Sequence, residues 1–323
     1  MTDLKTTQRK LIVAFTSYPP RFFCLEKVIN SLLLQTKKAD KIVLYLYEGE
    51  VPEKEKGFST GLKKQLAQNK FEIRWVKENL KPHKRYFYAF QDFPNDLIVT
   101  IDDDIAYPQN LLKVLYTSYL KHPNYVSACR VHTIATDKQK ILQYRYWLYE
   151  DDLHKNIPSH RLFATGVGGV LYPAYLFDKT LLNIQMIRET CLNADDLYLK
   201  FLEIANNIPV ILVEDLVKLN FISKSQNVGL CYINNGTQQL NDVQFQNICT
   251  YAKEKLGIDI TEKILASNPE WAESITLYER INKLKREIAV IKKSNSYLIG
   301  KAFTYLPRKA KKILEKILTG KQK

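Results

Sequence analysis

Three consecutive aspartates, Asp102, Asp103 and Asp104, follow a short apolar run at residues 97–101. A run of this length that is rich in β-branched residues predicts a buried strand. Open α/β sheets bind ligands beyond the carboxyl ends of their strands, which is where the three acids would emerge. This feature therefore favours an α/β fold in which a cluster of carboxylates faces a ligand.

The spacing of the acids indicates a metal site. Side chains alternate along a strand, so Asp102 and Asp104 would share one side and Asp103 would point away. Mg²⁺ is commonly bound by one or two carboxylates together with substrate phosphates. We predict that Asp104 and Asp102 hold Mn²⁺ or Mg²⁺ carrying a diphosphate. The alternative is a solvated acidic turn that Pro108 closes.

Strand and helix patterns alternate through the first part of the chain. Strand patterns cover residues 10–16, 41–46, 71–76 and 97–101, and helical spacing covers residues 25–33, 62–66 and 86–90. Such alternation predicts a Rossmann-like, mostly parallel sheet flanked by helices. We expect one α/β domain over residues 1–270, with a nucleotide half at about 10–125 and an acceptor half at about 126–265.

Most of the net charge of +14 lies at one end of the chain. Residues 280–323 hold 14 Lys or Arg and two Glu, so the remainder carries only +2. Apolar residues at 4-3-4-3 spacing over 277–291 predict a helix that packs on the protein itself or forms a homodimer. Basic and apolar residues interleave over 296–323, a pattern typical of an amphipathic helix at an anionic membrane surface.

We therefore expect a helical, basic extension at 271–323 that contacts a membrane surface. A solvated helix or an RNA-binding arm is the alternative, and we predict no nucleic-acid partner. The five cysteines form no Cys-x-x-Cys pair, and no segment has eighteen uninterrupted apolar residues. These features favour a reducing compartment and no membrane span, so we predict a cytoplasmic protein that is peripheral at the inner membrane face.

Three further groups could carry chemistry. Lys84 belongs to a basic loop at residues 81–85, where a cation would meet phosphate oxygens, although an ordinary basic loop is equally compatible. Residues 166–169 include Gly168 and Gly169, which permit close backbone approach to a ligand. Asp195 and Asp196 could include a general base, or they could be the cap and first-turn acid of a helix.

In order, residues 12–19, 81–84, 98–104, 166–169 and 194–196 resemble a bacterial nucleotide-sugar glycosyltransferase of GT-A fold, similar to family 2. The resemblance covers roughly residues 10–250. It implies transfer of a sugar from a nucleoside-diphosphate sugar, with UDP favoured, to a glycan or lipid-linked acceptor. It also implies a role in surface polysaccharide synthesis, in capsule or lipopolysaccharide, and inversion of the anomeric centre.

The resemblance also implies roles for individual residues. Nucleotide binding falls on the first strand's loop, on Lys84 and on two members of the aspartate triplet: Thr16, Ser17, Tyr18, Arg21, Lys84, Asp102 and Asp103. Gly168 and Gly169 would line the sugar pocket, and Asp196 or Asp195 would deprotonate the acceptor. The chain has no histidine after His160 to complete the metal site, so water or Asn220 would substitute.

Two other functions remain open from the sequence. A nucleotidyltransferase also needs acids and a metal at strand ends, but it would usually carry a glycine- and arginine-rich loop after its first strand. Residues 17–21 do not have that composition. A non-catalytic scaffold that binds membranes or nucleic acid through residues 280–323 is the second alternative.

Overall fold

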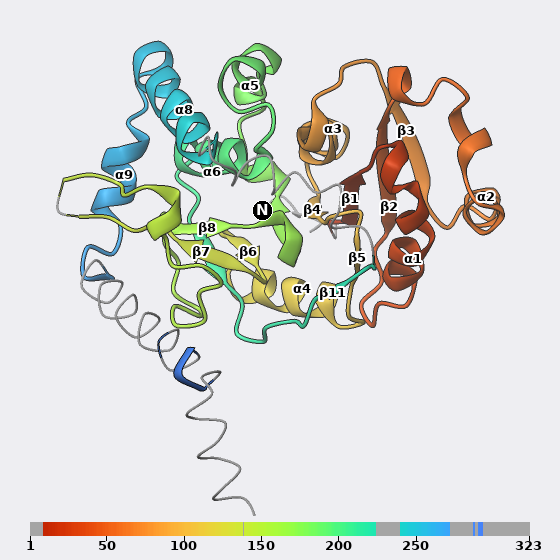
Figure 1. Ribbon diagram of the computed structural model, residues 1–323, viewed down its shortest axis with the longest axis horizontal. Coiled ribbons are helices and arrows are strands. Elements are labelled where there is room, and N and C mark those ends of the chain that lie inside the picture. Colours follow the sequence, from red (N-terminus) through yellow and green to blue (C-terminus); the bar gives the residue numbers. More distant parts are fainter. Residues whose placement is uncertain (1–8, 138, 224–239, 272–286, 288–289, 293–323) are drawn as a thin grey trace, which may run out of the picture. The chain divides into compact units, whose positions relative to one another are not determined.

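The structure is a computed structural model that describes residues 9–137, 139–223, 240–271, 287 and 290–292 (Figure 1). The chain divides into two compact units, residues 1–269 and 270–323. The predicted membrane segment at 296–323 lies outside the described residues. The predicted dimer seam at 277–291 also lies outside them, apart from Glu287 and residues 290–291. The architecture below is that of the first unit.

A central sheet contains seven strands, which are β1 (Leu11–Thr16), β2 (Lys41–Tyr47), β3 (Glu72–Val76), β4 (Leu97–Thr100), β6 (Val126–Ala128), β9 (Val170–Pro173) and β10 (Val210–Leu212). Their order is β10-β6-β9-β4-β1-β2-β3. Neighbours are parallel except at β9, which is antiparallel to both β4 and β6. The predicted α/β class with a mostly parallel sheet is confirmed.

In the first unit, the described residues form the α-helices α1 (Phe22–Leu33), α2 (Thr60–Ala67), α3 (Lys84–Asp92), α4 (Leu111–Lys121), α5 (Ile184–Thr190), α6 (Asp195–Ala205), α8 (Leu240–Leu256) and α9 (Ile260–Ala266). Leu11 and Val13 of β1 belong to a core that α1 and α4 cover. On the other face, Ile98 pairs with Tyr172, whose ring lies 5.8 Å from Phe90 of α3. Both faces are therefore covered, which explains why the strands read as continuous apolar runs.

Two short strand pairs build the surroundings of the acid triplet. β5 (Ile105–Ala106) pairs antiparallel with β11 (Asn220–Phe221), and β7 (Val131–Thr133) pairs antiparallel with β8 (Leu162–Ala164). Directly after β11, the N–H of Ile222 donates to the carbonyl of Asp104 at 2.9 Å. The chain beyond β10 therefore returns to the turn that carries the acids.

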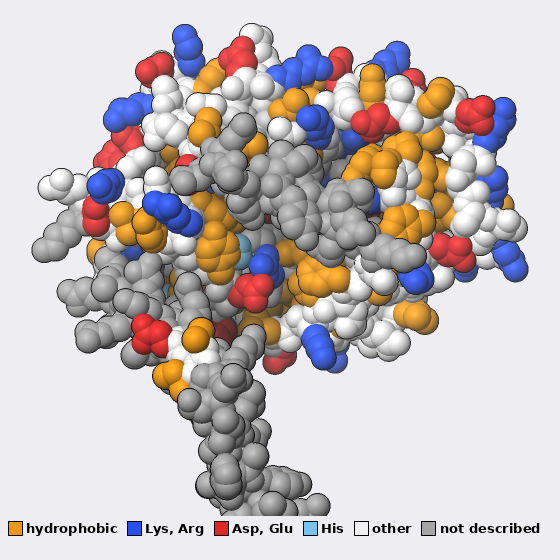
Figure 2. All heavy atoms as spheres, in the orientation of Figure 1, with side chains coloured by type: hydrophobic (Ala, Val, Ile, Leu, Met, Phe, Trp, Pro, Cys, Tyr) orange, Lys and Arg blue, Asp and Glu red, His pale blue; other side chains and the backbone are white. Residues whose placement is uncertain are grey.

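The two predicted halves share one sheet, because β6, β9 and β10 of the acceptor half extend the sheet that β1 to β4 begin. Figure 2 shows acidic and basic side chains interspersed over the described surface of one face. This distribution agrees with the small net charge of residues 1–279. Within the described part of the chain, no helix has both the length and the apolarity to cross a bilayer.

Candidate functional site

A cavity of about 1140 Å³ opens where β1 and β4 end at their carboxyl termini. Its walls come from the loop after β1, the start of α3, the acid turn after β4, the segment after β6 and the start of α6. Carboxyl ends of parallel strands meet at one edge of a sheet, so the topology brings these segments together. Residues from both predicted halves line this one cavity, and Arg21, Lys84, Asp102, Arg130 and Asp196 are among them.

The three aspartates do not divide as strand alternation predicted. β4 ends at Thr100, so the acids lie in a turn rather than in a strand. Asp103 accepts hydrogen bonds from the Ser17 hydroxyl at 2.6 Å and from Arg21 Nη1 at 2.7 Å. Asp104 lies 3.3 Å from Arg21 Nη2. Asp103 and Asp104 therefore share Arg21, so Asp103 does not point away from Asp104 as alternation predicted.

Arg21, Asp103 and Asp104 form a charge cluster in the wall of the cavity, in which both carboxylates are buried. Burial opposes the charge on Arg21, but Asp103 and Asp104 outweigh it, and the pKa of Arg21 is raised. Burial raises the pKa of Asp103, although Arg21 acts against this. Arg21 Nε is buried and has no hydrogen-bond partner among the described residues. Thr16, Ser17 and Tyr18 all line the cavity beside this cluster.

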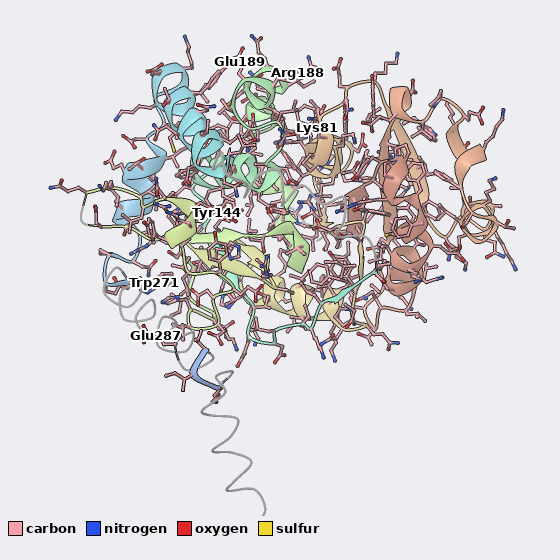
Figure 3. All side chains as sticks on the ribbon, viewed as in Figure 1. Lys81, Tyr144, Arg188, Glu189, Trp271 and Glu287 are labelled. Carbon is pink, nitrogen blue, oxygen red and sulfur yellow. The ribbon has the colours of Figure 1, made fainter. Side chains whose placement is uncertain are left out.

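Lys84 lies in the cavity wall at the start of α3 and is only 2% exposed. Its Nζ is 3.4 Å from Asn79 Oδ1, which is a long contact for a hydrogen bond. Burial lowers the pKa of Lys84, because an ammonium group loses hydration there. The neighbouring Lys81, labelled in Figure 3, is instead exposed and donates to Asn193 Oδ1 at 2.9 Å.

Arg85 connects more of the acids in this cavity than Lys84 does, although Lys84 was the predicted ligand-binding member of this basic loop. Its Nε donates to Asp195 at 2.7 Å, its Nη1 pairs with Asp102, and its Nη2 lies 3.3 Å from Asp196. Burial opposes the charge, but these three carboxylates raise the pKa of Arg85 well above its ordinary value. One guanidinium thus joins the acid turn to the acid pair at the start of α6.

The acid pair lies in the first turn of α6, and Ala194 is the N-cap residue, so neither acid is the cap. Asp195 is buried against Arg85. The Asp196 side chain is 27% exposed and lines the cavity, and the Gly166 N–H donates to its Oδ1 at 3.2 Å. Burial and the charge of Asp195 raise the pKa of Asp196 to about 8. A carboxylate with this pKa can accept a proton near neutral pH.

The glycines make room for two arginines. A Cβ on Gly166 would lie 2.1 Å from Arg85 Nη2, and a Cβ on Gly168 would lie 2.5 Å from the Cβ of Arg130. Gly168 lines the cavity as expected for a pocket residue. Gly169 does not line the cavity. It directly precedes β9, has a φ of +83°, and a Cβ at this position would meet Leu111. A sugar contact at Gly169 is therefore not supported by its position.

Asp102 and Asp104 are the side chains that would hold a divalent cation shared with a diphosphate. Both line the cavity, and Asp102 keeps 28% of its side chain exposed. Each carboxylate also contacts an arginine, Asp102 with Arg85 and Asp104 with Arg21. In the part of the chain that the structure describes, no group of three or more His, Cys, Asp or Glu could hold a metal by itself. Most ligands would then come from phosphate and water, as is usual for Mg²⁺. Asn220 is exposed and does not line the cavity, so it is a poor candidate for a further ligand.

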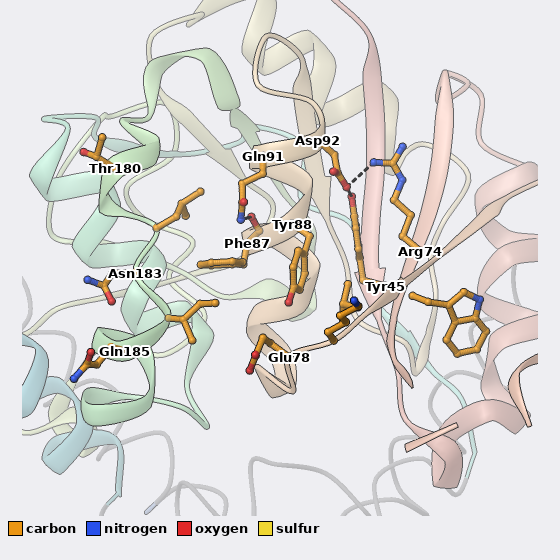
Figure 4. A pocket seen from close by; sticks show the side chains of 15 residues that line it. Tyr45, Arg74, Glu78, Phe87, Tyr88, Gln91, Asp92, Thr180, Asn183 and Gln185 are labelled. Atoms are coloured by element: carbon orange, nitrogen blue, oxygen red, sulfur yellow. Dashed lines mark hydrogen bonds and ion pairs between the residues drawn. The ribbon is translucent and has the colours of Figure 1, made fainter. Parts of the chain in front are cut away.

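A second, shallower hollow of about 810 Å³ lies beside α3 and the edge strand β3 (Figure 4). Arg74 lies 2.5 Å from Asp92, and Asp92 also accepts from the Tyr45 hydroxyl at 2.8 Å. These polar groups are therefore already paired with one another. The residues predicted to bind nucleotide, metal or sugar all lie outside this hollow.

No family model matches the chain, and no curated protein matches it. Solved structures that resemble parts of the fold include glucosyl-3-phosphoglycerate synthase from Mycobacterium tuberculosis with Mn²⁺, UDP-glucose and phosphoglyceric acid. It is 13% identical with a TM-score of 0.29, over 38% of this chain and 43% of that one. Its UDP complex is 14% identical with a TM-score of 0.28, over 38% and 44% of the two chains.

CMP:2-keto-3-deoxy-manno-octonic acid synthetase complexed with CTP is 9% identical with a TM-score of 0.40, over 70% of this chain and 99% of that one. The present chain spans less than half the length of the mycobacterial synthase in these matches.

Proposed function

We propose that the protein is a GT-A type glycosyltransferase that moves a sugar from a nucleoside-diphosphate sugar, with UDP favoured, to a glycan or lipid-linked acceptor. The main support is the composition of one cavity, which combines the acid triplet, Arg21, Arg85 and a second acid pair. Such a transfer needs cations for the leaving diphosphate and a base for the attacking hydroxyl. The cavity offers both within one enclosure.

The donor would occupy the side of the cavity formed by the loop after β1. Thr16, Ser17 and Tyr18 would contact the nucleoside, and the unpartnered Arg21 Nε offers one more hydrogen-bond donor there. Lys84 would place its ammonium near the diphosphate, whose negative charge would compensate the cost of burying that group. A Mg²⁺ or Mn²⁺ held by Asp102 and Asp104 would add positive charge against the departing nucleoside diphosphate.

Asp196 is the member of the acid pair that we assign as general base. An acceptor hydroxyl attacks the anomeric carbon of the donor sugar, and the bond from that carbon to the diphosphate oxygen breaks. The bonding electrons leave with the nucleoside diphosphate, and the hydroxyl proton passes to the Asp196 carboxylate. Direct displacement of this kind inverts the anomeric centre. Asp195, which is bound to Arg85 by both Nε and Nη2, would position that guanidinium rather than take the proton.

The basic composition of residues 280–323 supports a location at an anionic membrane surface, where surface polysaccharides such as capsule or lipopolysaccharide are assembled. Liposome flotation of the full chain, compared with a chain that ends at residue 270, tests this part separately. Flotation that persists without residues 271–323 would contradict it. Dimerisation through residues 277–291 is tested by the sedimentation of the same two proteins.

The donor assignment is tested by thermal unfolding of the full chain with a panel of nucleoside-diphosphate sugars and Mn²⁺. A ligand that binds only the native state raises the unfolding temperature by mass action. We expect a shift with at least one donor that disappears on chelation of the metal. Pyrophosphate release from a nucleoside triphosphate and a sugar, without nucleoside-diphosphate release from any donor, would instead indicate a nucleotidyltransferase and overturn the proposal.

A further inference from the structure

Aromatic side chains line the cavity wall that the β7–β8 pair and the segment between these strands contribute. His132, Tyr144, Tyr149 and Phe163 form this wall, and we call them the aromatic lobe. The His132 and Tyr149 rings lie 4.5 Å apart, and Tyr144 packs edge-on against Tyr149 at 5.5 Å. Tyr149 is 41% exposed. Tyr144, labelled in Figure 3, lies in the segment between β7 and β8.

Arg130 and Thr165 connect the aromatic lobe to the proposed base. Arg130 Nη2 lies 2.8 Å from Glu150, the residue after Tyr149, and its Nη1 donates to the Thr165 hydroxyl at 3.0 Å. Thr165 precedes Gly166, whose N–H donates to Asp196. A sugar ring stacked on Tyr149 would therefore lie on the same side of the cavity as Asp196, to which Tyr149 is linked through Glu150, Arg130, Thr165 and Gly166.

The aromatic lobe is fixed in place by hydrogen bonds and by an unusual backbone conformation. The Glu150 N–H donates to His132 Nδ1 at 3.0 Å, and the Tyr144 N–H donates to Asp242 Oδ1 at 2.7 Å. Glu150 has φ of +51°, a conformation that costs a residue with a side chain some energy and is enriched at ligand sites. The lobe is thus preformed rather than assembled by a ligand.

The charged groups around the aromatic lobe disfavour an anionic ligand. Glu150 and Asp152 line the cavity beside it, and Asp242 is bonded to Tyr144. Arg130, a cation that contacts this wall, is paired with Glu150. Asp151 is paired with His154. Burial and the charge of Arg130 lower the pKa of His132 to about 3, so its ring is neutral. The net charge at this wall is therefore negative.

We propose that the aromatic lobe is the acceptor subsite and binds a pyranose ring at the uncharged end of a glycan. The identification as an acceptor subsite rests on the proposed function. A sugar ring has apolar faces of C–H groups and a rim of hydroxyls, so it matches an aromatic face bordered by Glu150 and Arg130. A phosphorylated or carboxylated acceptor would be repelled by the excess of acidic over basic side chains at the same position.

Saturation-transfer NMR and titration can measure the binding of methyl glycosides to the full chain. These measurements, made without any nucleotide-sugar donor, test the inference. The probes are the methyl glycosides of glucose, galactose and N-acetylglucosamine, with methyl glucuronide as the anionic counterpart. We expect the neutral probes to bind more tightly than the glucuronide. Tyr149→Ala should weaken the binding of the best neutral probe by about fivefold. Tyr149→Phe keeps the aromatic ring, so its affinity for the same probe should stay within about twofold of the wild-type value.

Tyr146→Ala is the matched control, because Tyr146 is 43% exposed on the same segment but does not line the cavity. No binding of any neutral probe, tighter binding of the glucuronide, or equal losses in the Tyr149 and Tyr146 variants would overturn the inference. Failure of the proposed function is recognised separately, since it appears as a lack of nucleotide-sugar binding. Glycoside binding without donor binding would keep the sugar site and remove its role in transfer.

Discussion

Arg85 approaches Asp195 with two nitrogens, Nε at 2.7 Å and Nη2 at 2.6 Å from the same carboxylate oxygen. The contact joins the start of α3 to the start of α6, which are far apart in the sequence. The remaining contacts of the guanidinium reach Asp102 and Asp196, so it holds acids from the turn after β4 and from the first turn of α6 around one cavity. The geometry of the candidate site therefore depends on this one buried side chain.

Replacing Arg85 by lysine should disable the site while the fold persists. Lysine keeps a positive charge near Asp195, but its single ammonium cannot serve three carboxylates in the geometry of a guanidinium. We expect kcat/KM for nucleoside-diphosphate release to fall by about 100-fold, as for the loss of one or two charge-assisted hydrogen bonds. Arg188→Lys, at an exposed ion pair with Glu78, is the control and should change little. Wild-type activity in Arg85→Lys would rule out this organising role.

Gly166→Ala should displace the Arg85 guanidinium, since the added Cβ would lie 2.1 Å from Nη2. Overpacking at a buried site costs about 1–3 kcal/mol, which urea denaturation can measure. Activity should fall together with stability. Gly57→Ala is the matched control, because open space surrounds that position and we expect a change within about 0.5 kcal/mol. Equal effects of the two substitutions would contradict the assigned role of Gly166.

The pH dependence of activity tests Asp196 as the base. Burial and Asp195 raise its pKa to about 8, and a base acts only when ionised, so kcat/KM should rise with pH up to about that value. Stability should change in the opposite direction. The folded state binds the extra proton between the ordinary pKa of about 4 and the raised value, so the free energy of unfolding falls as pH rises through this range.

Asp196→Asn should remove both effects, with kcat lowered by about 100-fold or more. Rate measurements and urea titrations from pH 5 to 9 on the same two proteins give both readouts. A variant that retained the alkaline rise in activity would show that another group is the base.

His83 should make the protein sensitive to acid. Its Nε2 lies 2.9 Å from the Cys191 carbonyl, which only accepts, so Nδ1 must accept from the Tyr86 hydroxyl at 2.8 Å. Burial lowers the pKa of His83 to about 4. The unfolded chain binds the proton first, so the free energy of unfolding should fall by about 3 kcal/mol as pH drops from about 6.5 to 4. His83→Gln should have a shallower slope in urea titrations, and an unchanged slope would refute this.

Much of the nucleotide half could be predicted from the sequence because buried parallel strands appear as apolar runs separated by helical spacing. β9 could not, since it is four residues long, ends in Pro173 and follows a glycine-rich turn. The acid turn was located correctly, but its side-chain directions were not, because β4 ends at Thr100 and alternation stops there. The contacts that a side chain makes in a turn depend on the tertiary structure, which the periodicity of the sequence does not encode.

Arg85 and the aromatic lobe illustrate the same limit. Lys84 and Arg85 are adjacent in one basic loop, and composition alone cannot tell which side chain will meet Asp195. Tyr144 and Tyr149 lie in an aromatic-rich stretch of the sequence, but their packing with His132 requires the pairing of β7 with β8. The signal that could have favoured Arg85 is its guanidinium group, whose several N–H donors can bind more than one carboxylate at once.

Release of nucleoside diphosphate from nucleotide sugars with Mn²⁺, compared between the wild-type chain, Asp104→Asn and Asp102→Asn, tests the central claim most directly. Thermal unfolding of each protein establishes that it is folded. We predict metal-dependent release by the wild-type chain and a loss of about 100-fold or more in both variants, since each removes a charged oxygen ligand from the diphosphate-bound metal. Wild-type rates in the folded variants, or no release from any donor, would contradict the account.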